Sequence, residues 1–168
     1  MDDAWNRIAA LYQFKCTGCE DNCCQSLFFH HTHIEKEYLL YAFDRLESDK
    51  KNNILKKAEE YCRKTFPANG DIRSLKIICP LNENGQCILY PYRPMICRLH
   101  GLPHEIRRPG FNPLMGKGCE AGRFDGKDYI PFDRTPFYQN MAQLEADYRL
   151  KSKKVDKIKE TVAQILIS

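Results

Sequence analysis

The chain has 168 residues, of which 43% are apolar and 29% charged, so it can bury an ordinary hydrophobic core and is neither fibrous nor disordered. Its 26 Lys and Arg against 22 Asp and Glu give a formal net charge of +4, which predicts no nucleic-acid partner in the absence of a recognition motif. The first residues are acidic and the longest apolar run, Tyr38 to Phe43, is short, so we expect no export signal, no membrane span and no membrane partner.

The nine cysteines are the most unusual feature of the composition. An odd number cannot pair fully within one chain. Without an export signal we expect a cytoplasmic location, where clustered thiols serve metals or redox chemistry more often than disulfides. The cysteines are Cys16, Cys19, Cys23, Cys24, Cys62, Cys79, Cys87, Cys97 and Cys119. The sequence therefore predicts sulfur chemistry.

Three helices are predicted in the first part of the chain. Residues 3–12 carry an apolar stripe after two acidic residues, which favours a short amphipathic helix. Thr32 carries a capping-box signature at the start of a second helix over residues 32–46. The helical spacing of apolar residues over 54–62 predicts a third helix. Cys62 lies on the apolar stripe of this third helix, so we expect it in the core and not at a metal.

The middle of the chain is predicted to contain short strands and a long loop instead of helices. Residues 75–81 and 86–90 are typical of short strands, joined by an Asn-Glu-Asn-Gly turn that favours a hairpin. Residues 91–136 hold seven of the nine prolines and six of the nine glycines, so we expect a long loop there and no run of helices.

Residues 137–165 place apolar side chains at alternating spacings of three and four, which predicts one long C-terminal helix with a heptad seam. We expect a cysteine-cluster domain over residues 1–138. The helix over residues 139–168 either packs on that domain or makes a coiled-coil contact with a second copy or a partner protein. The predicted fold class is α+β, with helices that flank an irregular cysteine-rich centre and a short hairpin.

The spacing of the cysteines predicts a metal centre. Cys16 and Cys19 form a CxxC pair, which brings two sulfurs to one side of a tight turn, as structural zinc requires. A thioredoxin-like redox pair shares this spacing, but the βαβ pattern of that fold is absent. Cys23 and Cys24 are adjacent, so in an extended segment their side chains point to opposite faces and one thiolate per site is the easier geometry. Without Cys62, eight thiols remain, enough for two four-cysteine sites or one polynuclear cluster.

Zinc is the first expectation for the bound metal, and iron or an iron–sulfur cluster is the alternative. The run CxxCxxxCC has neither the ferredoxin spacing nor the usual spacing of radical enzymes that cleave S-adenosylmethionine, although a cluster can take ligands from distant segments. The second hypothesis is therefore an iron–sulfur enzyme or electron-transfer protein. Arg93 and Arg98 bracket Cys97, and we expect them to donate hydrogen bonds to sulfur.

The cysteine pattern resembles that of a known family. It consists of Cys16-Thr-Gly-Cys19-Glu-Asp-Asn-Cys23-Cys24, then Cys79-Pro-Leu, then Cys87-Ile-Leu-Tyr90-Pro-Tyr-Arg93-Pro94-Met-Ile-Cys97-Arg98 and finally Cys119. This pattern resembles the bacterial and archaeal CxxCxxCC family of zinc- or iron-chelating cysteine-cluster proteins, although this chain has one extra residue before the CC pair. The resemblance implies eight metal ligands, namely Cys16, Cys19, Cys23, Cys24, Cys79, Cys87, Cys97 and Cys119. Larger members of the family include flagellin lysine methylases, so the resemblance also implies a relation to protein lysine methylation.

Other candidate chemistry is sparse. His30, His31 and His33 gather at the entry to the second predicted helix, where we expect caps or surface groups. His100 is the first replacement ligand if one cysteine is not bound to the metal. The sequence contains no nucleotide-binding loop, nucleophile elbow or HExxH motif, so it leaves open whether the protein is an enzyme.

Overall fold

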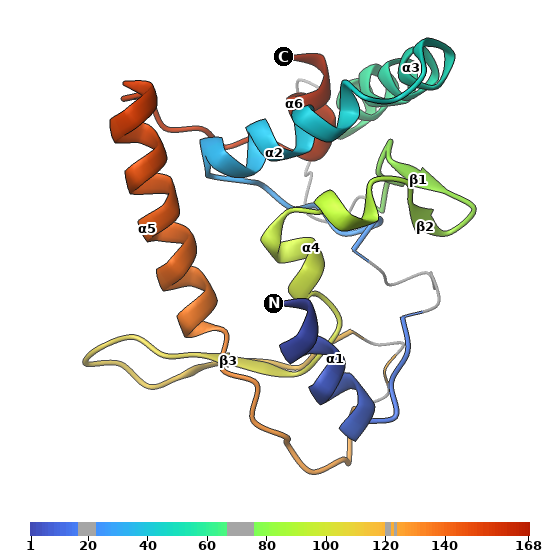
Figure 1. Ribbon diagram of the computed structural model, residues 1–168. Coiled ribbons are helices and arrows are strands. Elements are labelled where there is room, and N and C mark those ends of the chain that lie inside the picture. Colours follow the sequence, from blue (N-terminus) through green and yellow to red (C-terminus); the bar gives the residue numbers. More distant parts are fainter. Residues whose placement is uncertain (17–22, 67–75, 120–121, 123) are drawn as a thin grey trace.

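The computed structural model describes residues 1–16, 23–66, 76–119, 122 and 124–168. In these ranges, helices and two small hairpins surround an irregular middle, in agreement with the predicted mix of α and β structure (Figure 1). The helices are α1 (Asp2–Leu11), α2 (His33–Phe43), α3 (Ser48–Thr65), α4 (Met95–Leu99), α5 (Thr135–Ser152) and α6 (Val162–Ile167). Strands β1 (Asn82–Glu83) and β2 (Gln86–Cys87) form one antiparallel hairpin, and β3 (His104–Ile106) and β4 (Leu114–Gly116) form the other. None of the described helices is long and apolar enough to cross a membrane.

The larger core lies among α2, α3 and α6. Leu39 of α2, Ala58 of α3 and Ile165 of α6 are fully buried in it. Leu81 and Leu89 flank the β1–β2 hairpin and belong to the same core. Because these two leucines belong to the larger core, and Cys79 and Cys87 pack against it, that core holds the first hairpin beside the helices (Figure 1).

The smaller core packs α1 against α4 and the segment that follows it. The indole Nε1 of Trp5 donates a hydrogen bond to the carbonyl oxygen of His100 at 2.8 Å. The buried guanidinium of Arg134 donates to the carbonyl oxygens of Leu99 and Leu102. These bonds satisfy carbonyl groups at the end of α4 and fix the helix that carries one of the cysteines.

The first three predicted helices are confirmed, with shifted ends. The third begins at Ser48 instead of residue 54, because its first turns are polar and lie on the surface, where an apolar stripe is not needed. Thr32 is the residue before α2, but its hydroxyl donates to the Glu35 carboxylate and does not accept a backbone N–H. Cys62 of α3 packs against the larger core, as the apolar stripe predicts.

The predicted turn of the first hairpin is confirmed, whereas the predicted strands are much too long. Asn84 and Gly85 both have positive φ, 53° and 83°, as a tight two-residue hairpin turn requires. Each strand has only two residues, and residues 76–81 are irregular. Cys79 N–H donates to the carbonyl oxygen of Cys24 at 2.7 Å, so this segment pairs with Cys24 rather than extending the hairpin.

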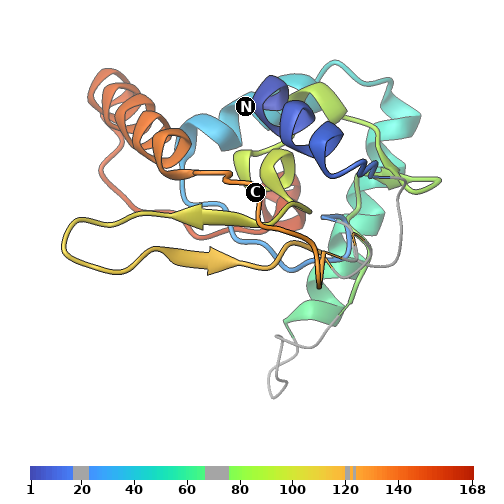
Figure 2. The same cartoon turned by 90° about the horizontal axis from the view of Figure 1, so that it is seen from below.

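The region predicted as one long loop contains α4 and the β3–β4 hairpin. The backbone of Glu105 in β3 accepts from Arg134 N–H at 2.9 Å and donates to the Phe132 carbonyl oxygen at 3.0 Å. A third segment therefore supports the hairpin at its base. Figure 2 shows that the hairpin then extends well beyond the helices. Its prolines and glycines lie mainly in the connection, where they do not interrupt strand pairing.

The prediction of a single long C-terminal helix is wrong, because this part of the chain forms two helices, α5 and α6. Helix α5 stops at Ser152, and Lys153 takes a left-handed conformation with φ of 56°. Arg149 then donates to the carbonyl oxygen of Lys154, which closes the helix end. Val155, a predicted seam residue, is 86% exposed. The heptad spacing thus arises from two amphipathic segments with different neighbours, and only α6 is buried in the larger core.

Candidate metal centre

Six cysteines from four segments gather between the β1–β2 hairpin and helices α1 and α4. They are Cys16, Cys23, Cys24, Cys79, Cys87 and Cys97. Two adjoining clefts, of about 280 Å³ and 130 Å³, are lined by five of these side chains, and the sixth, Cys79, lies behind them in the field of Cys24, Cys87 and Cys23. Cys16, Cys23, Tyr90 and Arg93 line both clefts. The fold therefore brings most of the sequence-predicted ligands to one place.

Cys23 forms one group of thiols with Cys97 and Cys16, called here the Cys23 group. Its thiol hydrogen-bonds to Cys24 and to Cys97. The bond with Cys24 lowers the pKa of Cys23, but the bond with Cys97, burial, and the charges of Cys97 and Cys16 raise it to about 12. Such a thiol keeps its proton at neutral pH unless a cation replaces it.

Cys24 forms a second group with Cys79 and Cys87, called here the Cys24 group. The pKa of Cys24 is raised, first by its hydrogen bond with Cys23 and then by burial, while a hydrogen bond from Asn82 opposes the shift. Burial raises the pKa of Cys79 well above its usual range, and the neighbouring thiols Cys24 and Cys87 add to the effect. Burial also raises the pKa of Cys87 to about 11.

Two cysteines of this second group share a local motif that the sequence reasoning missed. The backbone N–H of Leu81 donates to the sulfur of Cys79, and the backbone N–H of Leu89 donates to the sulfur of Cys87. Both bonds lower the thiol pKa, because they stabilise the sulfur as a thiolate. Since both leucines are buried in the larger core, the donors are held in place. The repeated Cys-x-Leu spacing is the sequence signal that predicts this arrangement.

Cys23 and Cys24 have different principal partners, but they do not lie on opposite faces, and the charge of Cys23 also raises the pKa of Cys79 in the Cys24 group. Their thiols hydrogen-bond to each other. The reason is local: residues 23–25 form a turn, so the alternation of an extended strand does not apply. The pair therefore links the two groups of thiols.

Arg93 and Arg98 flank these thiols, but their hydrogen bonds go to oxygen. Arg93 Nε donates to the Tyr90 carbonyl oxygen at 3.0 Å, and its guanidinium lies 3.5 Å from the centre of the Tyr90 ring. Arg98 donates to the Arg93 carbonyl oxygen at 2.7 Å and to the Asp2 carboxylate at 2.5 Å. The charge of Arg93 nevertheless lowers the pKa of both Cys24 and Cys87. Its contribution to this site is electrostatic.

The remaining sequence-predicted ligands, Cys19, Cys119 and the replacement ligand His100, are not among these six cysteines. Cys19 lies outside the described residues. Cys119 is buried in the smaller core, where its N–H donates to the Gly101 carbonyl oxygen at 2.9 Å and Phe14 packs nearby. His100, the predicted replacement ligand, lines the smaller cleft together with Cys16 and Cys97.

Two of the histidines at the entry to α2 make contacts that stabilise the fold. His30 pairs through its backbone with Glu160, and His33 Nε2 lies 3.1 Å from the carbonyl oxygen of Asp156. Both side chains are buried, whereas His31 is exposed. His30 and His33 therefore fasten α2 to the linker between α5 and α6.

The thiol donors suit a soft cation, although the described thiols are not positioned to coordinate one ion together. Thiolate ligands favour zinc, copper(I) and iron–sulfur clusters, and backbone N–H groups directed at sulfur are a usual support for such ligands. Among the described residues, no three or more His, Cys, Asp or Glu side chains are spaced to hold one ion.

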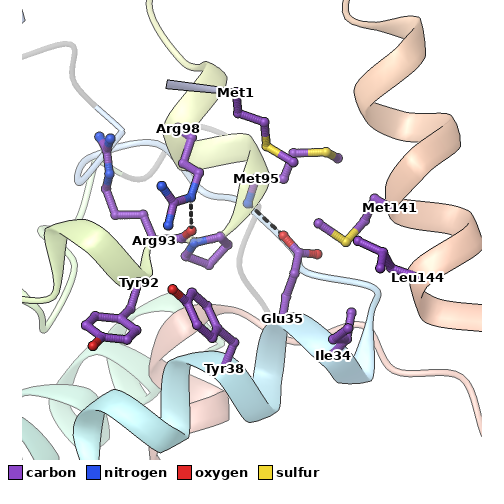
Figure 3. Close-up of a pocket in the computed structure, with 11 residues that line it drawn as sticks. Met1, Ile34, Glu35, Tyr38, Tyr92, Arg93, Met95, Arg98, Met141 and Leu144 are labelled. Carbon is purple, nitrogen blue, oxygen red and sulfur yellow. Dashed lines mark hydrogen bonds between the residues drawn. The ribbon is translucent and has the colours of Figure 1, made fainter. Parts of the chain in front are cut away.

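A third cavity, of about 270 Å³, shares Arg93 and Arg98 with the smaller cleft. Figure 3 shows these arginines on one side of the cavity, and on the other side the apolar residues of α2 and α5. Glu35 accepts a hydrogen bond from Met95 N–H at 2.7 Å within it. Met141 and Leu144, which the sequence places on the heptad seam, line this cavity, and Met141 also packs against the smaller core.

No protein-family model, curated protein or solved structure matches the chain in the three comparisons with known proteins.

Proposed function

We propose that the protein is a metal-binding protein in which cysteines of the central cluster hold one or two zinc or iron ions. The observation that carries this proposal is the meeting of six cysteines from four segments, two of which already accept backbone N–H bonds at sulfur. Thiols that raise one another's pKa are unfavourable neighbours as thiolates. A divalent cation removes that penalty, since it neutralises the charge that ionisation creates.

The two groups of thiols suggest how ions would be shared. The Cys23 group (Cys16, Cys23, Cys97) would hold one ion and the Cys24 group (Cys24, Cys79, Cys87) another. Cys19 and Cys119 complete the ligand set that the CxxCxxCC resemblance implies, and His100 is the replacement ligand. Arg93 would partly balance the negative charge of the occupied centre, since it already acts electrostatically on Cys24 and Cys87.

We propose a structural or interaction role, with zinc as the first metal. Closed thiolate shells favour structure over catalysis, because no coordination position remains for a substrate. The segments that meet at the cluster contain little regular structure, so cross-linking by a metal would stabilise them considerably.

The test is elemental analysis of protein purified without air. We expect about one or two zinc ions per chain and a colourless solution. Stoichiometric iron with acid-labile sulfide and visible absorbance would instead assign the cluster to an iron–sulfur centre and favour electron transfer or an enzyme. Folded protein that binds neither metal, even after anaerobic addition of zinc or iron and sulfide, would refute the proposal.

A further inference from the structure

The three most exposed large hydrophobic side chains among the described residues lie in two parts of the fold. They are Phe111 (77% exposed), Leu150 (83%) and Val155 (86%). Phe111 lies in the connection between β3 and β4. Leu150 is near the end of α5, and the Val155 carbonyl oxygen accepts a hydrogen bond from Arg149 of the same helix, so these last two are neighbours. In both views the β3–β4 connection and the C-terminal end of α5 lie toward the same side of the molecule, with the length of α5 between them, and this side is called here the outer edge (Figures 1 and 2).

The hairpin part of this edge is exposed along its whole length. Every residue from 107 to 115 is exposed, including Leu114 at 56% and Met115 at 53%. The tip is an ordered turn, since Phe111 N–H donates to the Arg108 carbonyl oxygen at 3.2 Å and Gly110 supplies the positive φ of 77°. The fold therefore presents an apolar group at the end of a projecting hairpin.

Both parts of the edge are positively charged. Residues 107–118 include two arginines and a lysine and contain no carboxylate. Arg107 is paired with Glu105 at 2.7 Å and with Asp133 at 3.7 Å, so the surplus charge of this part comes from Arg108 and Lys117. Residues 149–159 include Arg149, which bonds backbone carbonyl groups, and five lysines, against one carboxylate, Asp156. Lys154 is paired with Glu37 at 2.7 Å, so the surplus comes mainly from the exposed Lys151, Lys153, Lys157 and Lys159. Lys159 lies 4.7 Å from the centre of the Phe29 ring, which leaves Lys151, Lys153 and Lys157 in this part and Arg108 and Lys117 in the hairpin part as the exposed cations beside the apolar groups.

We propose that this edge, defined by residues 107–117 and 149–159, docks on the surface of an anionic lipid bilayer. The exposed Phe111, Leu150 and Val155 side chains enter the interfacial region, and the flanking arginines and lysines contact the headgroups. Docking of this kind needs no membrane-crossing helix. It is also independent of the metal proposal, because no cysteine of the cluster takes part.

The chemistry of the edge favours lipid over other partners. Two copies of this chain would bring cations against cations, which opposes self-association. Nucleic acid would meet the same cations, but Leu150 and Val155 offer no flat ring on which a base can stack. A bilayer interface accepts aliphatic and aromatic groups alike, and its phosphate groups meet the cations.

The experiment measures partition of the purified chain into vesicles. Vesicles of phosphatidylglycerol and phosphatidylcholine are compared with vesicles of phosphatidylcholine alone, at low and high salt. We expect binding to the anionic vesicles that weakens as salt rises, because screening reduces the attraction of the cations. Phe111→Ser and Leu150→Ser should each lower the partition coefficient about tenfold.

The matched control is Leu11→Ser, on α1, whose C-terminal end lies on the far side of the molecule in Figure 1. Leu11 is 62% exposed, so Leu11→Ser removes an amount of exposed apolar surface similar to that removed by the edge variants, but outside the edge. It should therefore change the partition coefficient less than about twofold. Absence of binding to anionic vesicles, or equal losses in Leu11→Ser and Phe111→Ser, would overturn the proposal. Binding to duplex DNA alone, or a dimer abolished by Phe111→Ser, would assign the edge to that partner instead.

Discussion

Cys79 and Cys62 show how position in the fold separates chemically identical side chains. Both touch the larger core, and burial raises the pKa of both thiols. Only Cys79 also accepts a backbone N–H bond at sulfur and lies in the field of other thiols. That difference makes the two cysteines a matched pair for testing the metal centre.

Replacement of Cys79 by serine should lower the metal content, because a hydroxyl is a poor substitute for a thiolate toward zinc. We expect a loss of up to about one ion per chain, measured by elemental analysis after gel filtration. Cys62→Ser is the control and should retain the full metal content. Equal metal content in both variants would mean that Cys79 is not a ligand.

His30 should make the fold sensitive to acid. Its side chain is 3% exposed and Nε2 has no hydrogen-bond partner, and burial lowers its pKa from 6.5 to about 4. The unfolded chain takes up this proton as pH falls below 6.5, whereas the folded chain stays neutral until about 4. Stability is therefore lost between these two values, by up to about 3 kcal/mol.

His30→Leu removes this titration and should flatten the pH dependence of the unfolding free energy between pH 6.5 and 4. Urea unfolding at several pH values measures it. His31→Gln, at the exposed neighbouring position, is the control and should keep most of the slope of the parent protein, because burial contributes more to the lowered pKa of His30 than the charge of His31 does. If the slope of His30→Leu is also unchanged, the histidine does not govern acid stability.

At the scale of elements, α6 owes its place to local bonds as well as to its apolar face. The Thr161 side chain accepts the N–H of Gln164, and the Gln164 side chain accepts the N–H of Thr161, which is a complete capping box. Thr32 occupies the equivalent place before α2 without a backbone bond from its side chain. The same residue type therefore stabilises one helix end and not the other.

Thr161→Ala should cost about 1 kcal/mol of stability, since it leaves the N–H of Gln164 without its acceptor in a buried place. Thr32→Ala should cost less, because only a hydrogen bond to the Glu35 side chain is lost. Urea unfolding of the two variants in parallel gives the comparison. A larger loss for Thr32→Ala would contradict the assigned role of the cap.

The elements predicted correctly are those fixed by local sequence. The apolar stripes of α1, α2 and α3 and the Asn84-Gly85 turn need only near neighbours. Helix α4 and the β3–β4 hairpin were missed because distant residues stabilise them, such as Arg134 at the end of α4 and Phe132 beside β3. The break at Lys153 was missed for the same reason, since periodicity cannot show that two segments pack against different neighbours.

For the site, the sequence predicts which residue types take part but not how they group. Spacing alone selects the cysteines, and the fold brings six of them together. The partners of Cys23 and Cys24, and the N–H bonds to Cys79 and Cys87, depend on turns and on leucines in the larger core. The exposed edge cannot be predicted from the sequence either, because nothing in the sequence distinguishes Phe111 and Leu150 from ordinary core residues.

At the scale of the whole molecule, the metal should order one part of the protein more than another. The α2–α3–α6 core buries large apolar side chains without help, whereas the cysteine segments contain little regular structure. Addition of zinc to metal-free protein should slow amide exchange most around residues 79–97 and least in α3 and α6. Mass spectrometry of deuterium uptake measures this. Uniform protection across the chain would mean that the cluster and the larger core unfold as one unit.

The position of α6 has a consequence for synthesis. Because Ile165 completes the core that α2 and α3 begin, the ribosome releases every cysteine of the cluster before that core can close. The nascent thiols are therefore exposed to oxidants and to competing metals during this interval. Early capture of an ion by the nascent Cys16, Cys23 and Cys24 thiols would protect them, and the order of synthesis would then place metal uptake before folding.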